Sequence, residues 1–151
     1  MKIYLASPLF DVKQKARINK VVNELRKGGH EVYSPMEHEI PNAWELPNSE
    51  WAFFVYAEDL ENLKKADAVV AIYEGMDSDT GTAWEIGCAF ALSKKIYVIV
   101  EDVSKIQSLM VINSANAVFP SVEDFVEAVV WEDIVPSDVN TCSALFPFYQ
   151  S

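Results

Sequence analysis

The sequence predicts a doubly wound α/β domain built on a five-stranded, mainly parallel sheet. Short β-rich apolar runs alternate with helical patterns along the chain, which is typical of this class. Gly28 and Gly29 end the first helical pattern, as a left-handed C-terminal stop requires. Residues 66–73 (ADAVVAIY) form a nearly continuous apolar run, as expected of a central strand covered on both faces.

The predicted elements follow one another in a regular order. Residues 2–6 (KIYLA) form the first strand, residues 11–27 the first helix and residues 30–34 (HEVYS) the second strand, which together make a βαβ unit. Residues 35–50 hold three prolines and are expected to form a loop over the sheet edge. The remaining expected elements are a helix at 51–65, the strand at 66–73, a turn-rich stretch at 74–82, a helix at 83–92, strands at 96–100 and near 117–119, and a closing helix at 122–131.

The chain length fits one domain, residues 1–151, of the doubly wound (flavodoxin-like) type, with residues 132–151 as a C-terminal tail. The net charge of −11, from 12 basic and 23 acidic residues, excludes the electrostatic footprint of a DNA- or RNA-binding protein. Cys88 and Cys142 form no spaced metal motif and are expected to be reduced thiols. Targeting signals and long apolar spans are absent from the sequence, so we expect a cytoplasmic protein that does not contact a membrane.

Ligands of doubly wound sheets bind outside the carboxyl ends of the strands, where the strand order reverses. Three segments therefore become candidates for a site: 6–10, 34–42 and 74–85. None of them contains a dinucleotide-binding or P-loop glycine motif, and neither His30 nor His38 has a partner at metal-ligand spacing. We therefore expect no cofactor and no metal.

Glu85 is the leading candidate for chemistry. It is expected on the first turns of an apolar helix (AWEIGCAFAL), near the positive end of the helix dipole, which favours its ionised form. Asp79 stands six residues earlier, and two carboxylates beside one cleft suit glycosidic chemistry. A purely structural role is an open alternative of about equal weight, because acidic residues commonly cap helix N-termini.

Two further residues have ordinary structural interpretations when each is taken alone. Asp59 is expected on a charged helix, where it would pair with Lys64 or with Lys65. Tyr4 is expected in the first strand, where a single tyrosine usually contributes packing.

Together these residues resemble the nucleoside 2-deoxyribosyltransferase family. The resemblance covers roughly residues 2–119 and consists of four motifs in the family's order. They are IYLASPLF with Tyr4 and Phe10, WAFFVYAEDL (51–60) with Asp59, DTGTAWEIGCA (79–89) with Asp79 and Glu85, and LMVINSANA (109–117), a loop after the fourth strand, with Asn116 or, as a weaker match, Asn113.

The resemblance implies an enzyme that transfers 2-deoxyribose between purine or pyrimidine bases with retention. Glu85 would attack C1′ of a deoxynucleoside, and Tyr4 would orient Glu85 by a hydrogen bond. Asp59 and Asp79 would contact the base, and one of them would supply the proton for the departing nitrogen. Phe10 and Trp51 would line the base pocket, and Asn116 would bind a sugar hydroxyl, often across a subunit interface. The implied partners are a deoxynucleoside, a free nucleobase and further copies of the chain, as dimers assembled into a hexamer.

The sequence also departs from the family pattern. Glu58 replaces an asparagine that commonly precedes the aspartate, and Glu37 and Glu39 stand where a base-reading residue is expected, so base preference is not transferred. The family chain often ends on a tyrosine whose carboxylate reaches a neighbouring site, whereas Gln150 and Ser151 follow Tyr149 here.

Three alternatives stay open. A 2′-deoxynucleoside 5′-monophosphate N-glycosidase would give the sugar to water and would need a phosphate cradle, for which Ser7 and Ser114 are candidates, although no basic residue flanks the Glu85 motif. A non-catalytic nucleotide-sensing module would bind without turnover. A purely structural interpretation must explain why the motifs all fall at one end of the sheet.

Overall fold

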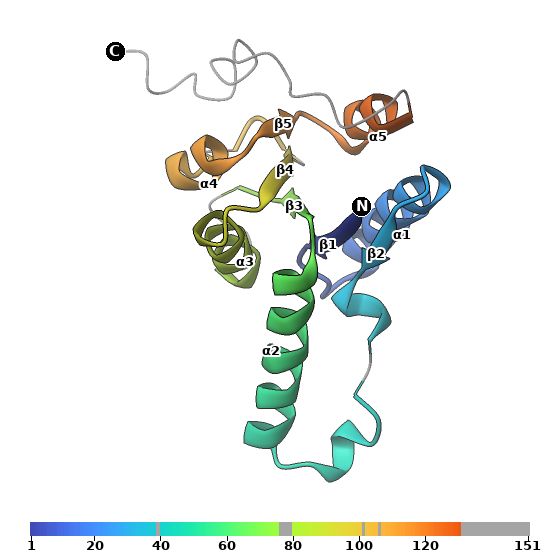
Figure 1. Cartoon of the computed structure of the whole chain (residues 1–151), viewed down its shortest axis with the longest axis vertical. Helices are drawn as coiled ribbons and strands as arrows, with labels where there is room; N and C mark the ends of the chain where they lie inside the picture. Colours follow the sequence, from blue (N-terminus) through green and yellow to red (C-terminus); the bar gives the residue numbers. More distant parts are fainter. Residues whose placement is uncertain (39, 76–79, 101, 106, 131–151) are drawn as a thin grey trace.

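The computed structural model describes residues 1–38, 40–75, 80–100, 102–105 and 107–130. Five strands form one sheet in the order β2-β1-β3-β4-β5, and every strand pair is parallel. Helices cover both faces of the sheet (Figure 1). The predicted doubly wound α/β fold is therefore confirmed, and the order reverses between β1 and β3.

The strands are β1 (Lys2–Ala6), β2 (Glu31–Tyr33), β3 (Ala68–Tyr73), β4 (Lys95–Val100) and β5 (Ala117–Phe119). The helices are α1 (Val12–Lys27), α2 (Asn48–Lys65), α3 (Thr80–Ala91), α4 (Leu109–Ser114) and α5 (Val122–Val130). These bounds agree with the expected elements to within a few residues, and the tail at 132–151 lies outside the described residues.

Two segments contain more regular structure than the sequence predicted. Within 35–50, two short 3₁₀ helices, η1 (Pro35–Glu37) and η2 (Ala43–Glu45), and the first turn of α2 replace the expected loop. The expected loop at 109–117 contains α4, whose residues Val111 and Ile112 are buried. A helix this short has little stability of its own, so tertiary packing rather than local propensity accounts for it.

The N-terminus of α1 is fixed by a capping box. The Asp11 carboxylate accepts a hydrogen bond from the Gln14 backbone N–H (2.8 Å), and the Gln14 side chain accepts one from the Asp11 N–H (3.1 Å). The helix ends at Gly28, and Gly29 follows with a φ of 82°, a left-handed conformation that glycine adopts without steric cost.

The sheet separates two apolar layers. On one face, α1 and α5 contribute Ile18, Val21, Leu25 and Phe125 to a core with the inward residues of the strands. On the other face, α2, α3 and α4 pack against the alternate strand residues, a set that includes Tyr4. Strands buried on both faces explain the nearly continuous apolar runs in the sequence.

Helix α2 extends well beyond the sheet. Leu63, in its last turn, is its one residue classed as buried, whereas Phe53 and Tyr56 are half or more exposed. Figure 1 shows α2 and the η1–η2 segment projecting together from the body as an arm. This arm forms a wall beside the carboxyl ends of β1 and β2. In the described ranges, no helix is long and apolar enough to span a bilayer.

Candidate active site

A cleft of about 590 Å³ opens at the carboxyl ends of the first three strands. Its walls come from the three segments that the sequence singled out. Ser7, Leu9 and Phe10 follow β1, Gly81 and Glu85 lie on α3, and the residues that follow β2 are Pro35, Met36, His38 and Ile40. The arm contributes Trp44, Trp51 and Asp59. The cleft therefore lies where the strand order reverses, as ligand sites in this fold do.

Tyr4 and Glu85 are joined across this edge of the sheet. The Tyr4 hydroxyl donates a hydrogen bond to Glu85 Oε1 at 2.5 Å. Tyr4 is fully buried, and burial, followed by the nearby negative charge of Glu85, raises its pKa far above the ordinary value of 10.0. The phenol therefore remains protonated and acts as a permanent donor to a partly exposed carboxylate.

A second pair lies beside the first. Tyr33 is the in-register neighbour of Tyr4 on β2, and the two rings stack with centroids 5.5 Å apart. The Tyr33 hydroxyl donates to Asp59 Oδ1 at 2.8 Å. Burial raises the pKa of the Asp59 carboxyl above 3.8, against the opposing effect of the Tyr33 hydrogen bond. Asp59 thus keeps its proton to a higher pH than an exposed aspartate does.

The histidine that directly follows η1 completes the stack of rings. His38 stacks on Tyr33 with centroids 4.3 Å apart, and its Nδ1 lies 3.7 Å from Glu58 Oε1. Glu58, Asp59 and Glu85 all line the cleft. Ionisation of all three carboxyl groups at once is disfavoured, because like charges repel in a partly buried cleft. Asp59, whose pKa is raised by burial, is therefore the carboxyl group best suited to carry a proton.

The structure brings several predicted site residues together. Ser7, Phe10 and Trp51 line the same cleft as Asp59 and Glu85. Asp79 and Glu39 lie outside the described residues, so their roles stay predictions.

Asn116 is not near this cleft within one copy of the chain. It precedes β5 at the amino end of the sheet, where its Oδ1 accepts from the Ile96 N–H and its own N–H donates to the Ile96 oxygen, both at 2.7 Å. Asn113 lies on α4, and its amide donates to the Leu109 oxygen at 2.8 Å.

Sequence reasoning missed Tyr33, His38 and Lys15, which also belong to this region. Tyr33 lies in a three-residue strand and acquires its role from Tyr4, which is distant in sequence. His38 fell in a segment expected to be a loop. Lys15 lies one helical turn after the Asp11 cap. The first turn of a helix that follows β1 faces the carboxyl edge of the sheet, so the position of Lys15 in the sequence could have predicted its place in the cleft.

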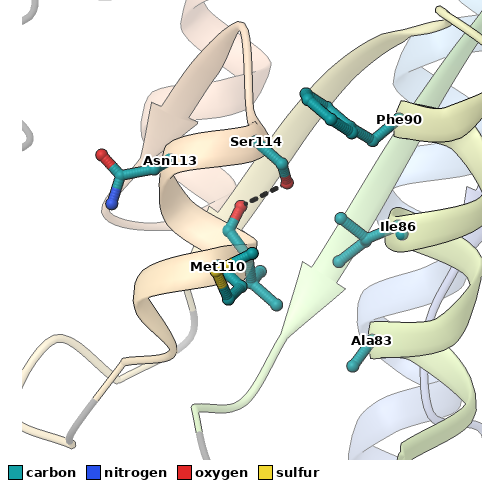
Figure 2. A pocket seen from close by; sticks show the side chains of 8 residues that line it. Ala83, Ile86, Phe90, Met110, Asn113 and Ser114 are labelled. Carbon is teal, nitrogen blue, oxygen red and sulfur yellow. Dashed lines mark hydrogen bonds between the residues drawn. The ribbon is translucent and has the colours of Figure 1, made fainter.

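A separate apolar groove of about 240 Å³ lies between α3 and α4. Figure 2 shows Ala83, Ile86 and Phe90 of α3 facing Met110 of α4 across it, with the hydrogen bond from Ser114 Oγ to the Val111 oxygen (2.8 Å) inside α4. This groove holds no titratable residue among those that line it. Among the described residues, no group of three His, Cys, Asp or Glu side chains is placed to hold a metal ion.

The raised pKa of Asp59 predicts that this residue lowers stability at neutral pH. A folded-state pKa above 3.8 gives stability that is complete below 3.8 and is lost as the pH rises through the folded value. Asp59→Asn keeps an oxygen that accepts from Tyr33 but carries no charge. Its melting temperature is therefore expected to exceed that of the parent at pH 7, with the gain shrinking toward pH 4, in thermal unfolding followed by circular dichroism. A variant that is less stable than the parent at pH 7 and equal to it at pH 4 would contradict this assignment.

Comparisons with known proteins identify the family of this chain. The family model for nucleoside 2-deoxyribosyltransferase matches residues 3–134. A nucleoside deoxyribosyltransferase of Limosilactobacillus fermentum is 30% identical over 107 residues, which are 65% of this chain and 64% of that protein's length. The 2-deoxyribosyltransferase of the psychrotolerant bacterium Bacillus psychrosaccharolyticus is 39% identical with a TM-score of 0.75, over 82% of this chain and 89% of that one.

A CMP N-glycosidase of Clostridium botulinum has the same fold, with a TM-score of 0.60 and 20% identity over 87% of this chain and all (100%) of that one. The family model covers far more than half of the sequence, including both members of the Tyr4–Glu85 pair. This chain therefore belongs to the nucleoside 2-deoxyribosyltransferase family.

Proposed function

We propose that this chain transfers 2-deoxyribose between purine or pyrimidine bases through a covalent ester on Glu85. The observation that carries the proposal is the contact between the Tyr4 hydroxyl and Glu85 Oε1 at the wall of the cleft. This contact fixes the carboxylate of Glu85 beside the cleft, where it can act as a nucleophile. Family membership supports the same role.

In the first step, a carboxylate oxygen of Glu85 attacks C1′ of a bound deoxynucleoside. The C1′–N bond breaks with its electron pair going to the base nitrogen, and a glycosyl ester forms. The transition state has oxocarbenium character, and the Glu85 anion stabilises the positive charge that develops on the sugar. Tyr4 limits the rotation of the carboxylate so that it faces the anomeric carbon.

The departing nitrogen needs a proton, and Asp59 is the described group best suited to supply it. Burial raises its pKa above 3.8, which brings this carboxyl closer to the pKa that a general acid needs near neutral pH. Asp79, outside the described residues, is the other candidate for contact with the base.

In the second step, a nitrogen of a second base attacks C1′ and displaces the Glu85 carboxylate. The proton of the attacking nitrogen returns to the Asp59 carboxylate, so charge and atoms balance over the cycle. Two inversions at C1′ give net retention. The second base binds where the first base was, between Phe10 and Trp51 in the cleft.

One observation favours a second candidate, hydrolysis of deoxynucleoside 5′-monophosphates. Lys15 and Ser7 line the cleft and offer a cation and a hydroxyl to a phosphate. Three carboxylates line the same cleft and repel a phosphate dianion, which favours a neutral nucleoside. Transfer is therefore the better-supported reaction.

We also propose that the active form is a homo-oligomer in which a second copy covers the groove between α3 and α4. Phe90 and Met110 border this groove and are 62% and 81% exposed. Gly87 lies there in the interior of α3, and a Cβ added to it would meet nothing within 4 Å. Glycine weakens a helix interior, so its presence without an intrachain packing reason in the described residues supports close approach by another chain.

The reaction is tested by incubating the protein with thymidine and free adenine and separating the products by chromatography. Deoxyadenosine is expected, and Glu85→Gln is expected to reduce its formation to the level without protein, because an amide oxygen does not form the ester. Glu127→Gln, an exposed position on α5, is the matched control and is expected to keep full activity. Thymine without deoxyadenosine would indicate hydrolysis, and cytosine release from deoxycytidine 5′-monophosphate would favour the second candidate. Binding without any turnover would favour a sensing module.

Tyr4→Phe isolates the contribution of the hydrogen bond to Glu85. The ring stays available to stack on Tyr33, but the donor is lost. The rate of ester formation in single-turnover kinetics is expected to fall roughly ten- to a hundredfold, the size of a lost hydrogen bond to a charged group. A rate equal to that of the parent would show that Glu85 is oriented by other groups.

Gly87→Ala separates helix stability from association. The added methyl is expected to stabilise α3 by about 1 kcal/mol, through helix propensity, while hindering the approach of a second copy. Sedimentation velocity over a range of protein concentrations measures association, and thermal unfolding at the lowest concentration measures the stability of the separate chain. A parent that stays monomeric at every concentration, or a variant that associates as tightly as the parent, would contradict the proposed interface.

A further inference from the structure

Gln14 makes contacts beyond those of an ordinary capping residue. It is a buried polar side chain on the first turn of α1, 9% exposed. Its Oε1 accepts from the backbone N–H groups of Phe10 (2.7 Å) and Asp11 (3.1 Å). These two bonds fix the end of the segment that lines the cleft after β1, and they use only the oxygen of the side-chain amide.

The nitrogen of the same amide faces a residue from another strand connection. Gln14 Nε2 lies 3.4 and 3.3 Å from the two carboxylate oxygens of Glu74. The Arg17 guanidinium, one turn further along α1, also donates to Glu74 Oε1 and forms an ion pair with it. The Arg17 and Glu74 side chains are 25% and 23% exposed, so this contact is shielded from solvent on most sides.

This arrangement ties one wall of the cleft to the end of a neighbouring strand. Ser7, Leu9 and Phe10 follow β1 and line the cleft. Glu74 directly follows β3, which pairs with β1. The amide of Gln14 therefore bonds with its oxygen to the backbone of this wall and with its nitrogen to the residue after β3.

We propose that Gln14 and Arg17 are positioning residues that act through Glu74 to hold the Phe10 wall in place against the carboxyl end of β3. The Phe10 side chain is 75% exposed, so few contacts of its own fix its position. Its direction toward a substrate base therefore depends on how firmly its backbone is held by Gln14. The bridge thereby controls the affinity for the nucleoside more than the chemistry at C1′. This inference rests on the proposed function, because it concerns the substrate of the same cleft.

Gln14→Glu tests the bridge without removing the helix cap. Glutamate at this position of a capping box still accepts from the Phe10 and Asp11 N–H groups. Its second oxygen, however, faces the Glu74 carboxylate and cannot donate, and one guanidinium then serves two carboxylates. We expect KM for thymidine to rise roughly tenfold, as for a lost hydrogen bond to a charged group, while kcat stays within about twofold.

The double variant Gln14→Glu with Glu74→Gln supplies the rescue. It exchanges the amide and the carboxylate between the two positions, so one amide, one carboxylate and Arg17 again face each other. KM is expected to return toward the parent value. Glu123→Gln is the matched control, because it removes another contact of α1, the ion pair with Lys20, far from the cleft. It is expected to leave KM unchanged.

Two outcomes would overturn the proposal: equal KM values for Gln14→Glu and Glu123→Gln, or a loss of kcat with a large fall in melting temperature that the double variant does not rescue. A parent without transfer or hydrolysis would instead overturn the proposed function. In that case, amide hydrogen exchange at Phe10 decides the bridge by itself. Faster exchange in Gln14→Glu that returns to the parent rate in the double variant would support the bridge, and unchanged exchange would refute it.

Discussion

The hydrogen bond between Tyr4 and Glu85 is the contact on which the site depends, and it requires the whole sheet to be formed. Tyr4 pairs in register with Val69 of β3 and Tyr33 of β2, so its position is fixed by strands on both sides. Glu85 lies on α3, which must cross back over the sheet from β3 to reach Tyr4. A right-handed crossover is the rule for parallel strands, and it decides which face of the sheet α3 covers. Here α3 packs on the face that also contains Tyr4. A fully buried phenol needs a hydrogen-bond partner, and the Glu85 carboxylate beside the cleft supplies it.

The stacked rings give this end of the sheet its electrostatic character. Tyr4, Tyr33 and His38 stack in sequence, and the carboxylates of Glu85, Asp59 and Glu58 lie beside them in the same order. The apolar faces of the rings limit solvation of the carboxylates, and the phenols donate to two of them. A donor pulls the pKa of its carboxylate down, whereas burial pushes it up, and at Asp59 burial has the larger effect. The environment of the cleft thus makes Asp59 a weaker acid than an exposed aspartate.

Hydrophobic patterning was sufficient to predict the strands and most of the helices, because strands buried on both faces and amphipathic helices leave distinct periods. It failed for α4, whose six residues are helical because Val111 and Ile112 pack on the sheet, a condition set by distant residues. Glu85 was identifiable from its place after an apolar strand. Tyr33 was not, because a tyrosine in a short strand is indistinguishable from a packing residue until its register with Tyr4 is known. Local sequence patterns cannot predict contacts that depend on the register between strands distant in sequence.

The end of the sheet at which a polar residue lies decides what it can do within one copy of the chain. Asn116 lies at the amino end and binds both backbone groups of Ile96, which aligns β5 with β4. A six-residue strand such as β4 is about 20 Å long, so a side chain at its start cannot reach a cleft beyond the carboxyl end. If Asn116 contacts a sugar, it must do so in the cleft of another copy, where its Nδ2 can donate to a hydroxyl while its Oδ1 keeps the bond from Ile96. Without association, its role is limited to aligning the two strands.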